Sequence, residues 1–148
     1  MIVNMEDLLE AVPIVGMVGR KMTEHGVSYG LSEAGYDIRI KQRVWLNTAR
    51  RFELASAIEE FNMPRDLVGI VHDKSTWARQ GLSVFNTVIE PGWKGFLTLE
   101  LVYHGDGSLV IPAGAGIAQV VFHKTTRDAA YSGKYQGQAD RPVEAIRS

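Results

Sequence analysis

The chain has 148 residues, of which 45% are hydrophobic and 22% are charged, and its formal net charge is −1. This length favours one domain that buries roughly 70% of its unfolded-chain surface, and the charge argues against broad nucleic-acid binding, which needs a basic surface. The lack of cysteine excludes disulfides, thiolate metal sites and a cysteine nucleophile. Because we find neither a membrane-length apolar run nor a signal-peptide pattern, we expect a cytoplasmic protein, in the host cytoplasm if the source is viral.

Residues 1–16 give an ambiguous signal that is compatible with a short helix, and a strand follows. Asn4 is suited to cap the helix, because Glu6 and Asp7 then lie in its first turn. In residues 27–40, VSYGLSEAGYDIRI, apolar and polar residues alternate in the second half. This alternation predicts a strand that is buried on one face, and residues 43–46 continue the sheet after a bend.

The middle of the chain begins with an ambiguous segment. Residues 51–60 carry mixed signals, because Phe52, Leu54, Ala55 and Ile58 are spaced like the apolar stripe of a helix. Short apolar runs between turn residues then predict strands at 67–71, 82–86, 96–102, 109–111 and 117–122. Many short strands with Gly- and Pro-rich turns and little helix favour an all-β sandwich or barrel.

The chain divides into a domain and a tail. Residues 1–130 contain every predicted strand and form one β domain. Residues 131–148 are small and polar and lack a core period, which predicts a flexible C-terminal tail. Such a tail can close over a ligand and exclude water, although a disordered terminus is the simpler interpretation.

A group of hydroxyl and cationic residues follows the strand at 67–71. Lys74, Ser75, Thr76 and Arg79 surround one predicted helical turn, and the four-residue spacing from Ser75 to Arg79 puts both on one side of it. Amides, hydroxyls and cations together suit phosphate groups. A capped surface turn with solvated cations explains the same residues.

Glu100 lies on an unexpected face of its strand. In residues 96–102, FLTLELV, three leucines share the natural core face. Glu100 shares the other face with Phe96 and Val102, which indicates that this face is covered by another layer or a neighbouring subunit. A covered carboxylate has a raised pKa and suits a general base, although an exposed glutamate is the simpler interpretation. Glu90, in the preceding turn, is interpreted as solvated.

The histidines and glycines add no known site. The four histidines have no HxxxH or HxE spacing, and no P-loop or dinucleotide fingerprint occurs. Zinc-dependent nucleobase deaminases use a His/Cys/Cys set, which a chain without cysteine does not provide.

Four blocks of sequence resemble the dCTP deaminase family, which shares a trimeric β-fold with the dUTPases. In chain order they are SYGLSEAGYDIRI, the stretch from FNMPRDLVGI to GFLTLEL, PAGAGIAQVVF and GKYQGQ. They span residues 28–138, although residues 31–35 form an insertion and the N-terminal region is short. The resemblance implies a dUTPase-like distorted jelly roll or β-sandwich with short helices. It also implies a homotrimer with active sites at subunit interfaces.

The resemblance further implies that the chain deaminates dCTP to dUTP and ammonia without zinc, as a hydrolase of a cyclic amidine C–N bond. Glu100 matches the family's catalytic glutamate, which moves a proton from the water attacking cytosine C4 to the departing ammonia. Arg79 would support that glutamate, and Ser75 would position water and phosphate. The other implied substrate contacts are Lys74, Thr76, Thr87, Val88, Trp93, Gln119, Tyr131, Lys134, Tyr135 and Gln138. The implied metal is Mg²⁺ bound through the substrate phosphates, the tail would close over the nucleotide, and inhibition by dTTP is a habit of the family.

Two other functions stay open. The first is dUTP hydrolysis, alone or bifunctionally with deamination. The dUTPases carry Asp at the position of Glu90 and an apolar residue at that of Glu100, so glutamate at both favours deamination. The second is a non-catalytic nucleotide-binding regulatory module, against which Glu100, Arg79 and Ser75 argue. The sequence does not decide between dCTP, dCMP and a 5-substituted dCTP as substrate.

Overall fold

A computed structural model describes residues 1–85 and 87–147, in which β-strands are the predominant regular structure. The strands are β1 Ile2–Val3, β2 Lys21–Glu24, β3 Val27–Leu31, β4 Tyr36–Arg39, β5 Val44–Asn47, β6 Phe52–Asn62, β7 Leu67–Asp73, β8 Leu82–Val84, β9 Val88–Ile89, β10 Lys94–Tyr103, β11 Ser108–Ile111 and β12 Gly116–Lys124. The helices are α1 Met5–Ala11 and α2 Ser75–Ala78. Neither of these described helices is long and apolar enough to cross a membrane.

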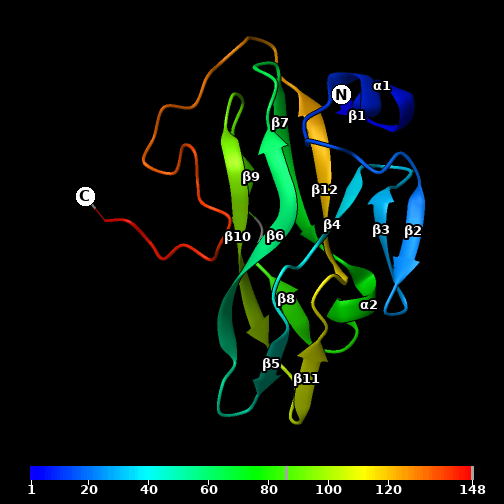
Figure 1. The fold of residues 1–148 in the computed structure, drawn as a ribbon, viewed down its shortest axis with the longest axis vertical. Coiled ribbons are helices and arrows are strands. Elements are labelled where there is room, and N and C mark those ends of the chain that lie inside the picture. The colour runs from blue at the N-terminus through cyan, green and yellow to red at the C-terminus, as the bar shows by residue number, and fades with distance from the viewer. Residues whose placement is uncertain (86, 148) are drawn as a thin grey trace.

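The strands form two main sheets and a ribbon (Figure 1). The larger sheet has the order β2-β3-β4-β12-β7-β9, and β1 adds to it by pairing with β12. The second sheet has the order β6-β10-β8, and β11 pairs with β5 in the ribbon. The β11–β5 ribbon projects at the lower end of Figure 1, whereas α1 lies at the opposite end. This architecture confirms the all-β expectation.

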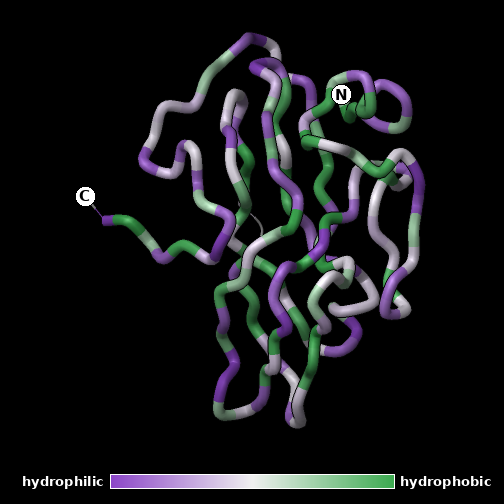
Figure 2. The backbone as a smooth tube through the Cα atoms, viewed as in Figure 1, coloured by the Kyte–Doolittle hydropathy of each residue, from purple (hydrophilic) through white to green (hydrophobic). Residues whose placement is uncertain are grey.

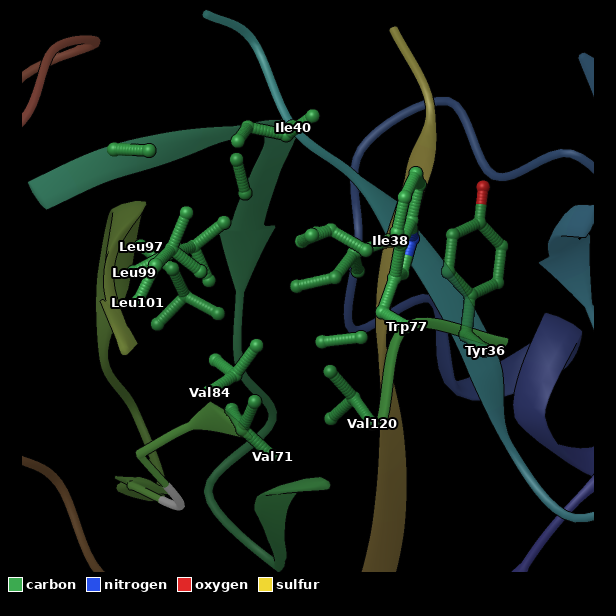
Figure 3. Packing of buried hydrophobic residues seen from close by; sticks show 14 of the residues in the cluster. Tyr36, Ile38, Ile40, Val71, Trp77, Val84, Leu97, Leu99, Leu101 and Val120 are labelled. Carbon is green, nitrogen blue, oxygen red and sulfur yellow. The ribbon is translucent and has the colours of Figure 1, made fainter. Parts of the chain in front are cut away.

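The core lies between the two sheets, and β10 supplies much of it. Leu97, Leu99 and Leu101 are at most 8% exposed, as the alternation predicts. Figure 3 shows these leucines on the side of β10 that faces Ile38 and Val120 of the larger sheet. In Figure 2, hydrophobic stretches run along the inner strands while hydrophilic stretches concentrate in the outer turns. Glu100 therefore belongs to the outer face of the smaller sheet.

The helical interpretation of residues 51–60 is wrong. This segment lies in β6, which pairs antiparallel with β10 from Lys94↔Asn62 to Val102↔Phe52, with one register shift. Each paired residue gains a ladder hydrogen bond or a cross-strand side-chain contact. These non-local contacts outweigh the local spacing of apolar residues.

The expectation that β4 is buried on one face only is also wrong. Asp37 is only 4% exposed, although it belongs to the polar set of the alternation. Lys74 donates a hydrogen bond from Nζ to Asp37 Oδ2 at 2.8 Å. An ion pair with a residue 37 positions away thus removes this carboxylate from solvent, because a buried charge needs a partner.

The expectation that residues 43–46 continue the sheet is wrong, because β5 pairs with β11 in the separate ribbon. The segment 27–40 forms two strands, β3 and β4, and the other predicted elements are confirmed with small changes of boundary. The helix after Asn4 forms, although the Asn4 side chain donates to the carbonyl oxygen of Glu33 and not to the helix. The predicted strand 82–86 appears as β8, and its last predicted residue, Asn86, lies outside the described residues. The pattern did not indicate the short strands β1, β2 and β9.

The C-terminal segment returns to the domain and follows β10 (Figure 1). Gln138 forms a parallel bridge with Gly95, and the Phe96 amide donates to the Gln138 carbonyl oxygen at 3.1 Å. At Gly95 a Cβ atom would lie 2.6 Å from the Gln138 nitrogen, and φ is +139°. Only glycine accommodates this close approach of two backbones without strain.

Candidate active site

Glu100 lies in a cavity of about 630 Å³ between the outer face of β10, its neighbouring segments and the C-terminal tail. The cavity is lined by Phe52, Leu54, Thr87, Val88, Ile89, Glu90, Trp93, Leu97, Thr98, Glu100, Tyr131, Tyr135, Gln138, Val143 and Ala145. Its size falls within the range of small-molecule sites. A nucleoside-sized ligand fits such a volume, and Glu100 is in position to face it.

The electrostatic state of Glu100 follows from its burial. Removal from water raises the pKa of the Glu100 carboxyl above its ordinary value, and a backbone hydrogen bond partly opposes this rise. No charged side chain contributes to this shift of the pKa. The carboxylate is therefore desolvated without an ion-pair partner from the described part of its own chain, which suits an acid–base group.

The C-terminal tail closes one side of the Glu100 cavity. The Trp93 indole donates from Nε1 to the Tyr135 carbonyl oxygen at 2.8 Å. Further along, the Val143 amide donates to Thr98 Oγ1 at 3.0 Å, and Lys41 pairs with Asp140 at 2.6 Å. Figure 2 shows a hydrophobic stretch close to the C-terminus. Val143 and Ala145 of the tail line the cavity together with Glu100.

A second, smaller cavity of about 290 Å³ gathers polar residues at the start of α2. It is lined by Lys21, Ser28, Ser32, Glu33, Asp37, Asp73, Lys74, Ser75 and Gln119. Gln119 donates from Nε2 to Ser32 Oγ at 2.9 Å, and Lys74 donates from Nζ to Ser28 Oγ at 2.9 Å. The hydroxyl, amide and ammonium donors suit phosphate oxygens, but the Lys74 charge is already paired with Asp37.

Comparison with known proteins decides the family. The family model described as dCTP deaminase-like matches residues 38–125. A dCTP deaminase of Herpetosiphon aurantiacus is 37% identical over 145 residues, covering 76% of this chain and 79% of that protein. One from Acidovorax is 35% identical over 153 residues, covering 81% of this chain and 79% of that protein. The chain belongs to the dCTP deaminase-like family.

The solved structures agree with this family at the level of the fold. EIAV dUTPase has a TM-score of 0.58 at 16% identity, covering 77% of this chain and 90% of that chain. The dUTPase of Staphylococcus bacteriophage 80alpha has a TM-score of 0.59 at 17% identity, covering 78% and 88% respectively. A mutant dUTPase from phage phi11 of S. aureus, described as coordinating a structural Mg(II) ion, has a TM-score of 0.59 at 16% identity, covering 77% and 88%. At these identities the likeness shows the dUTPase-like fold alone.

The residues that the family resemblance singled out fall into three groups. The first group lines the Glu100 cavity and comprises Thr87, Val88, Trp93, Glu100, Tyr131, Tyr135 and Gln138. The second group lines the polar cavity and comprises Lys74, Ser75 and Gln119. Thr76, Arg79 and Lys134 line neither of these two cavities.

Arg79 is the residue that departs most from its expected place. Its side chain donates from Nε to Ser75 Oγ at 3.2 Å, so the predicted proximity of Arg79 and Ser75 is present. Arg79 and Glu100 nevertheless do not share a cavity within one described chain. For Arg79 to contact Glu100 as predicted, the two residues would have to come from different copies of the chain.

Several lining residues escaped the reasoning from sequence. Phe52 and Leu54 reach the Glu100 cavity from β6, and nothing in the chain indicates which strand pairs with β10. Thr98 lies two residues before Glu100, so strand alternation puts both side chains on the same face of β10. Asp37 and Ser28 hold Lys74 through contacts that have no local sequence signal.

The described residues contain no group of three or more His, Cys, Asp and Glu side chains placed to hold a metal ion. The polar cavity is lined by ammonium, hydroxyl and amide groups and also by the carboxylates of Glu33, Asp37 and Asp73, of which Asp37 is paired with Lys74.

Proposed function

We propose that this protein deaminates dCTP to dUTP and ammonia with one water molecule. The observation that carries the proposal is Glu100, a desolvated carboxylate on the floor of a nucleoside-sized cavity. Membership of the dCTP deaminase-like family and relatives named dCTP deaminase support it. The reaction breaks the C4–N4 bond of cytosine and forms a C4–O bond.

Glu100 acts first as a base and then as an acid. Its carboxylate accepts a proton from water as the water oxygen attacks C4 and passes this proton to N3, which gives a neutral tetrahedral intermediate. Glu100 then takes the proton of the C4 hydroxyl and delivers it to the amino group, which leaves as ammonia while the C4 carbonyl of dUTP forms. The raised pKa of Glu100 brings it closer to the operating pH, where such catalysis is typically worth about 10²–10⁴-fold.

The two cavities divide the nucleotide between them. The Glu100 cavity has the size and apolar lining for base and sugar, with Trp93 among its walls. The polar cavity offers Lys74, Ser75 and Gln119 to phosphate oxygens. Mg²⁺ would bridge the phosphates of the bound nucleotide and neutralise part of their charge, while these side chains orient them.

A second copy of the chain completes the site in this proposal. Arg79 is exposed beside Ser75 and does not line the Glu100 cavity of its own chain. In a homotrimer with sites between subunits, Arg79 and Ser75 of one copy would meet Glu100 of another. The guanidinium would then hold the attacking water beside Glu100.

Mixing two inactive variants tests this division. Glu100→Gln and Ser75→Ala chains are each expected to lose most activity as homotrimers. Trimers reassembled from both contain sites with Glu100 from one chain and Ser75 from the other, and these should regain part of the activity. Mixtures that stay inactive although mass measurements show mixed trimers would refute the shared site.

The tail would complete the site by closing over the bound nucleotide. Its residues Tyr131, Tyr135 and Gln138 line the Glu100 cavity, and Lys134 lies over the Tyr135 ring at 5.7 Å. Closure excludes water other than the attacking one. Removal of residues 131–148 should therefore lower kcat/KM for dCTP.

A second candidate, dUTP hydrolysis to dUMP and pyrophosphate, is tested beside the first, although glutamate at positions 90 and 100 favours deamination. Glu90 lines the same cavity as Glu100, so a carboxylate is present where dUTPases carry the aspartate that positions water. Incubation with dCTP, dCMP or dUTP plus Mg²⁺, followed by chromatography, separates the candidates. Ammonia and dUTP from dCTP support deamination, and pyrophosphate from dUTP supports the second candidate. Binding of dCTP or dTTP without turnover would support the third candidate, a non-catalytic regulatory module.

A further inference from the structure

The Glu100 cavity contains an exposed aromatic side chain that the proposed reaction has not used. Phe52 lines the cavity and is 52% exposed, whereas Phe61 and Phe122 are at most 1% exposed in the core. Leaving half of a phenyl ring in water forfeits hydrophobic stabilisation. In the single chain, the Phe52 ring is open to the cavity that holds the candidate base, where a planar ligand can cover it.

The strand register places Phe52 next to Glu100. Glu100 is paired with Leu54, and Val102 is paired with Phe52. Residues 52 and 54 of one strand share a face, and directly paired residues share it too. Phe52 is therefore the diagonal neighbour of Glu100, a separation of about 7–8 Å that an aromatic side chain spans.

The other three aromatic residues of the cavity are already engaged. Trp93 is 6% exposed and its indole nitrogen donates to the tail. The Tyr131 hydroxyl accepts from the Tyr135 amide at 3.1 Å, and the Tyr135 hydroxyl accepts from the Ile146 amide at 3.0 Å. Phe52 makes no such contact with the tail and is 52% exposed, so its ring is open to a planar ligand.

An exposed aliphatic residue from the larger sheet also lines the cavity. Val88 belongs to β9, which pairs with β7. Val88 is 53% exposed and lines the same cavity as Phe52 and Glu100. It adds to the apolar lining that a planar base would contact.

We propose that Phe52 is the residue on which the pyrimidine ring stacks. This inference rests on the proposed function and assigns a positioning role within it. A base whose C4 shares a water molecule with Glu100 lies within reach of the Phe52 ring. Stacking fixes the plane of the base and thereby the direction from which the water reaches C4. It acts on the base and not on the phosphates.

The test separates the base from the rest of the nucleotide. Steady-state kinetics with dCTP would be measured for Phe52→Ala, Phe52→Leu and Phe52→Tyr. Loss of one base–aromatic stack weakens binding by about 5- to 150-fold, so Phe52→Ala should raise KM for dCTP at least 5-fold. Phe52→Tyr, which keeps the ring, should stay within about 2-fold, and Phe52→Leu should fall between, as expected for stacking.

A ligand without a base gives the decisive control. The inhibition constant of a base-free deoxyribose 5′-triphosphate should be unchanged in Phe52→Ala, because this ligand has nothing to stack. Equal weakening of dCTP and the base-free ligand, an unchanged KM for dCTP, or a changed oligomeric mass would each overturn the inference. Absence of turnover by the unsubstituted protein would instead count against the proposed function. In that case equilibrium binding of the same two ligands still decides the role of Phe52.

Discussion

The indole of Trp93 donates a hydrogen bond to the main-chain carbonyl of Tyr135 at 2.8 Å. Trp93 is otherwise a core residue, 6% exposed, whose ring lies 6.2 Å from that of Phe61 in a tilted arrangement. A single side chain thus joins the core of the domain to the tail that walls the Glu100 cavity. The position of the tail depends on the packing of the domain beneath it.

Replacing the indole by a phenyl ring should loosen the tail and leave the domain folded. Trp93→Phe retains most of the aromatic contact with Phe61 but removes the Nε1–H donor. A net hydrogen bond contributes about 0.5–1.5 kcal/mol, so amide exchange in residues 131–147 should accelerate about 2- to 10-fold. Hydrogen exchange with mass spectrometry measures this directly.

The matched control is Trp45→Phe, because Trp45 is 58% exposed on the β11–β5 ribbon. Its replacement should leave exchange in the tail unchanged. Equal acceleration in both variants, or none in Trp93→Phe, would show that this hydrogen bond does not hold the tail.

Burial of Glu100 predicts the direction in which the Glu100→Gln substitution changes thermal stability. Its folded-state pKa is raised by desolvation, so the folded protein binds the proton more tightly than the unfolded chain. The carboxyl's contribution to stability is complete below its unfolded pKa and is lost as pH rises through the folded pKa. Glu100→Gln should therefore raise Tm at pH 7 while removing deamination.

Thermal unfolding at several pH values tests this sign. The Tm gain of Glu100→Gln should shrink as pH falls towards 4, about the ordinary glutamate pKa, because the native carboxyl is then protonated. Glu60→Gln, which removes an exposed carboxylate from β6, is the matched control and should show no such gain. A Tm for Glu100→Gln below that of the unsubstituted protein at pH 7 contradicts the prediction.

The sequence reveals the site where local periodicity decides the structure. Period-2 alternation alone put the leucines of β10 inside and Glu100 on a second, covered face, as found. The structure also identifies the cover within one chain, which is the tail with Val143 and Ala145. That answer depends on contacts across more than 40 residues, such as Val143 with Thr98.

Local patterns fail where distant partners decide. Residues 51–60 could pass for a helix until β10 pairs with them, and Phe52 enters the site only through that pairing. Strand alternation likewise predicts that Asp37 is exposed, whereas its ion pair with Lys74 accompanies its burial. The separation of Glu100 from Arg79 is a property of the three-dimensional arrangement that no spacing along the chain reveals.

Removing one member of the Lys74–Asp37 ion pair should destabilise the protein more than removing both. Both side chains are largely buried, with exposed fractions of 12% and 5%. Lys74→Met leaves an uncompensated buried carboxylate, which typically costs about 3–5 kcal/mol. The double variant Lys74→Met/Asp37→Asn should regain a large part of that loss, because it removes the lone charge.

Urea unfolding of the two single variants and the double variant gives the coupling energy of this pair. Lys21→Met with Glu33→Gln is the matched control, because that pair is exposed at 48% and 82%, and surface pairs contribute about 0–1 kcal/mol. Additive effects of Lys74→Met and Asp37→Asn would show that the two groups do not depend on each other.

A strained residue at the end of α1 offers a stabilising substitution. Val12 has φ +49° and ψ +57°, the left-handed conformation that a β-branched residue rarely adopts, and its side chain is 49% exposed. Glycine takes this conformation without strain and is the preferred residue just after a helix. Val12→Gly should therefore raise the free energy of unfolding by about 0.5–1 kcal/mol, because the relieved strain exceeds the entropy cost of glycine. Val15→Gly, at a similarly exposed valine without positive φ, should lower it, and equal losses in both variants at fixed protein concentration would contradict the argument from strain.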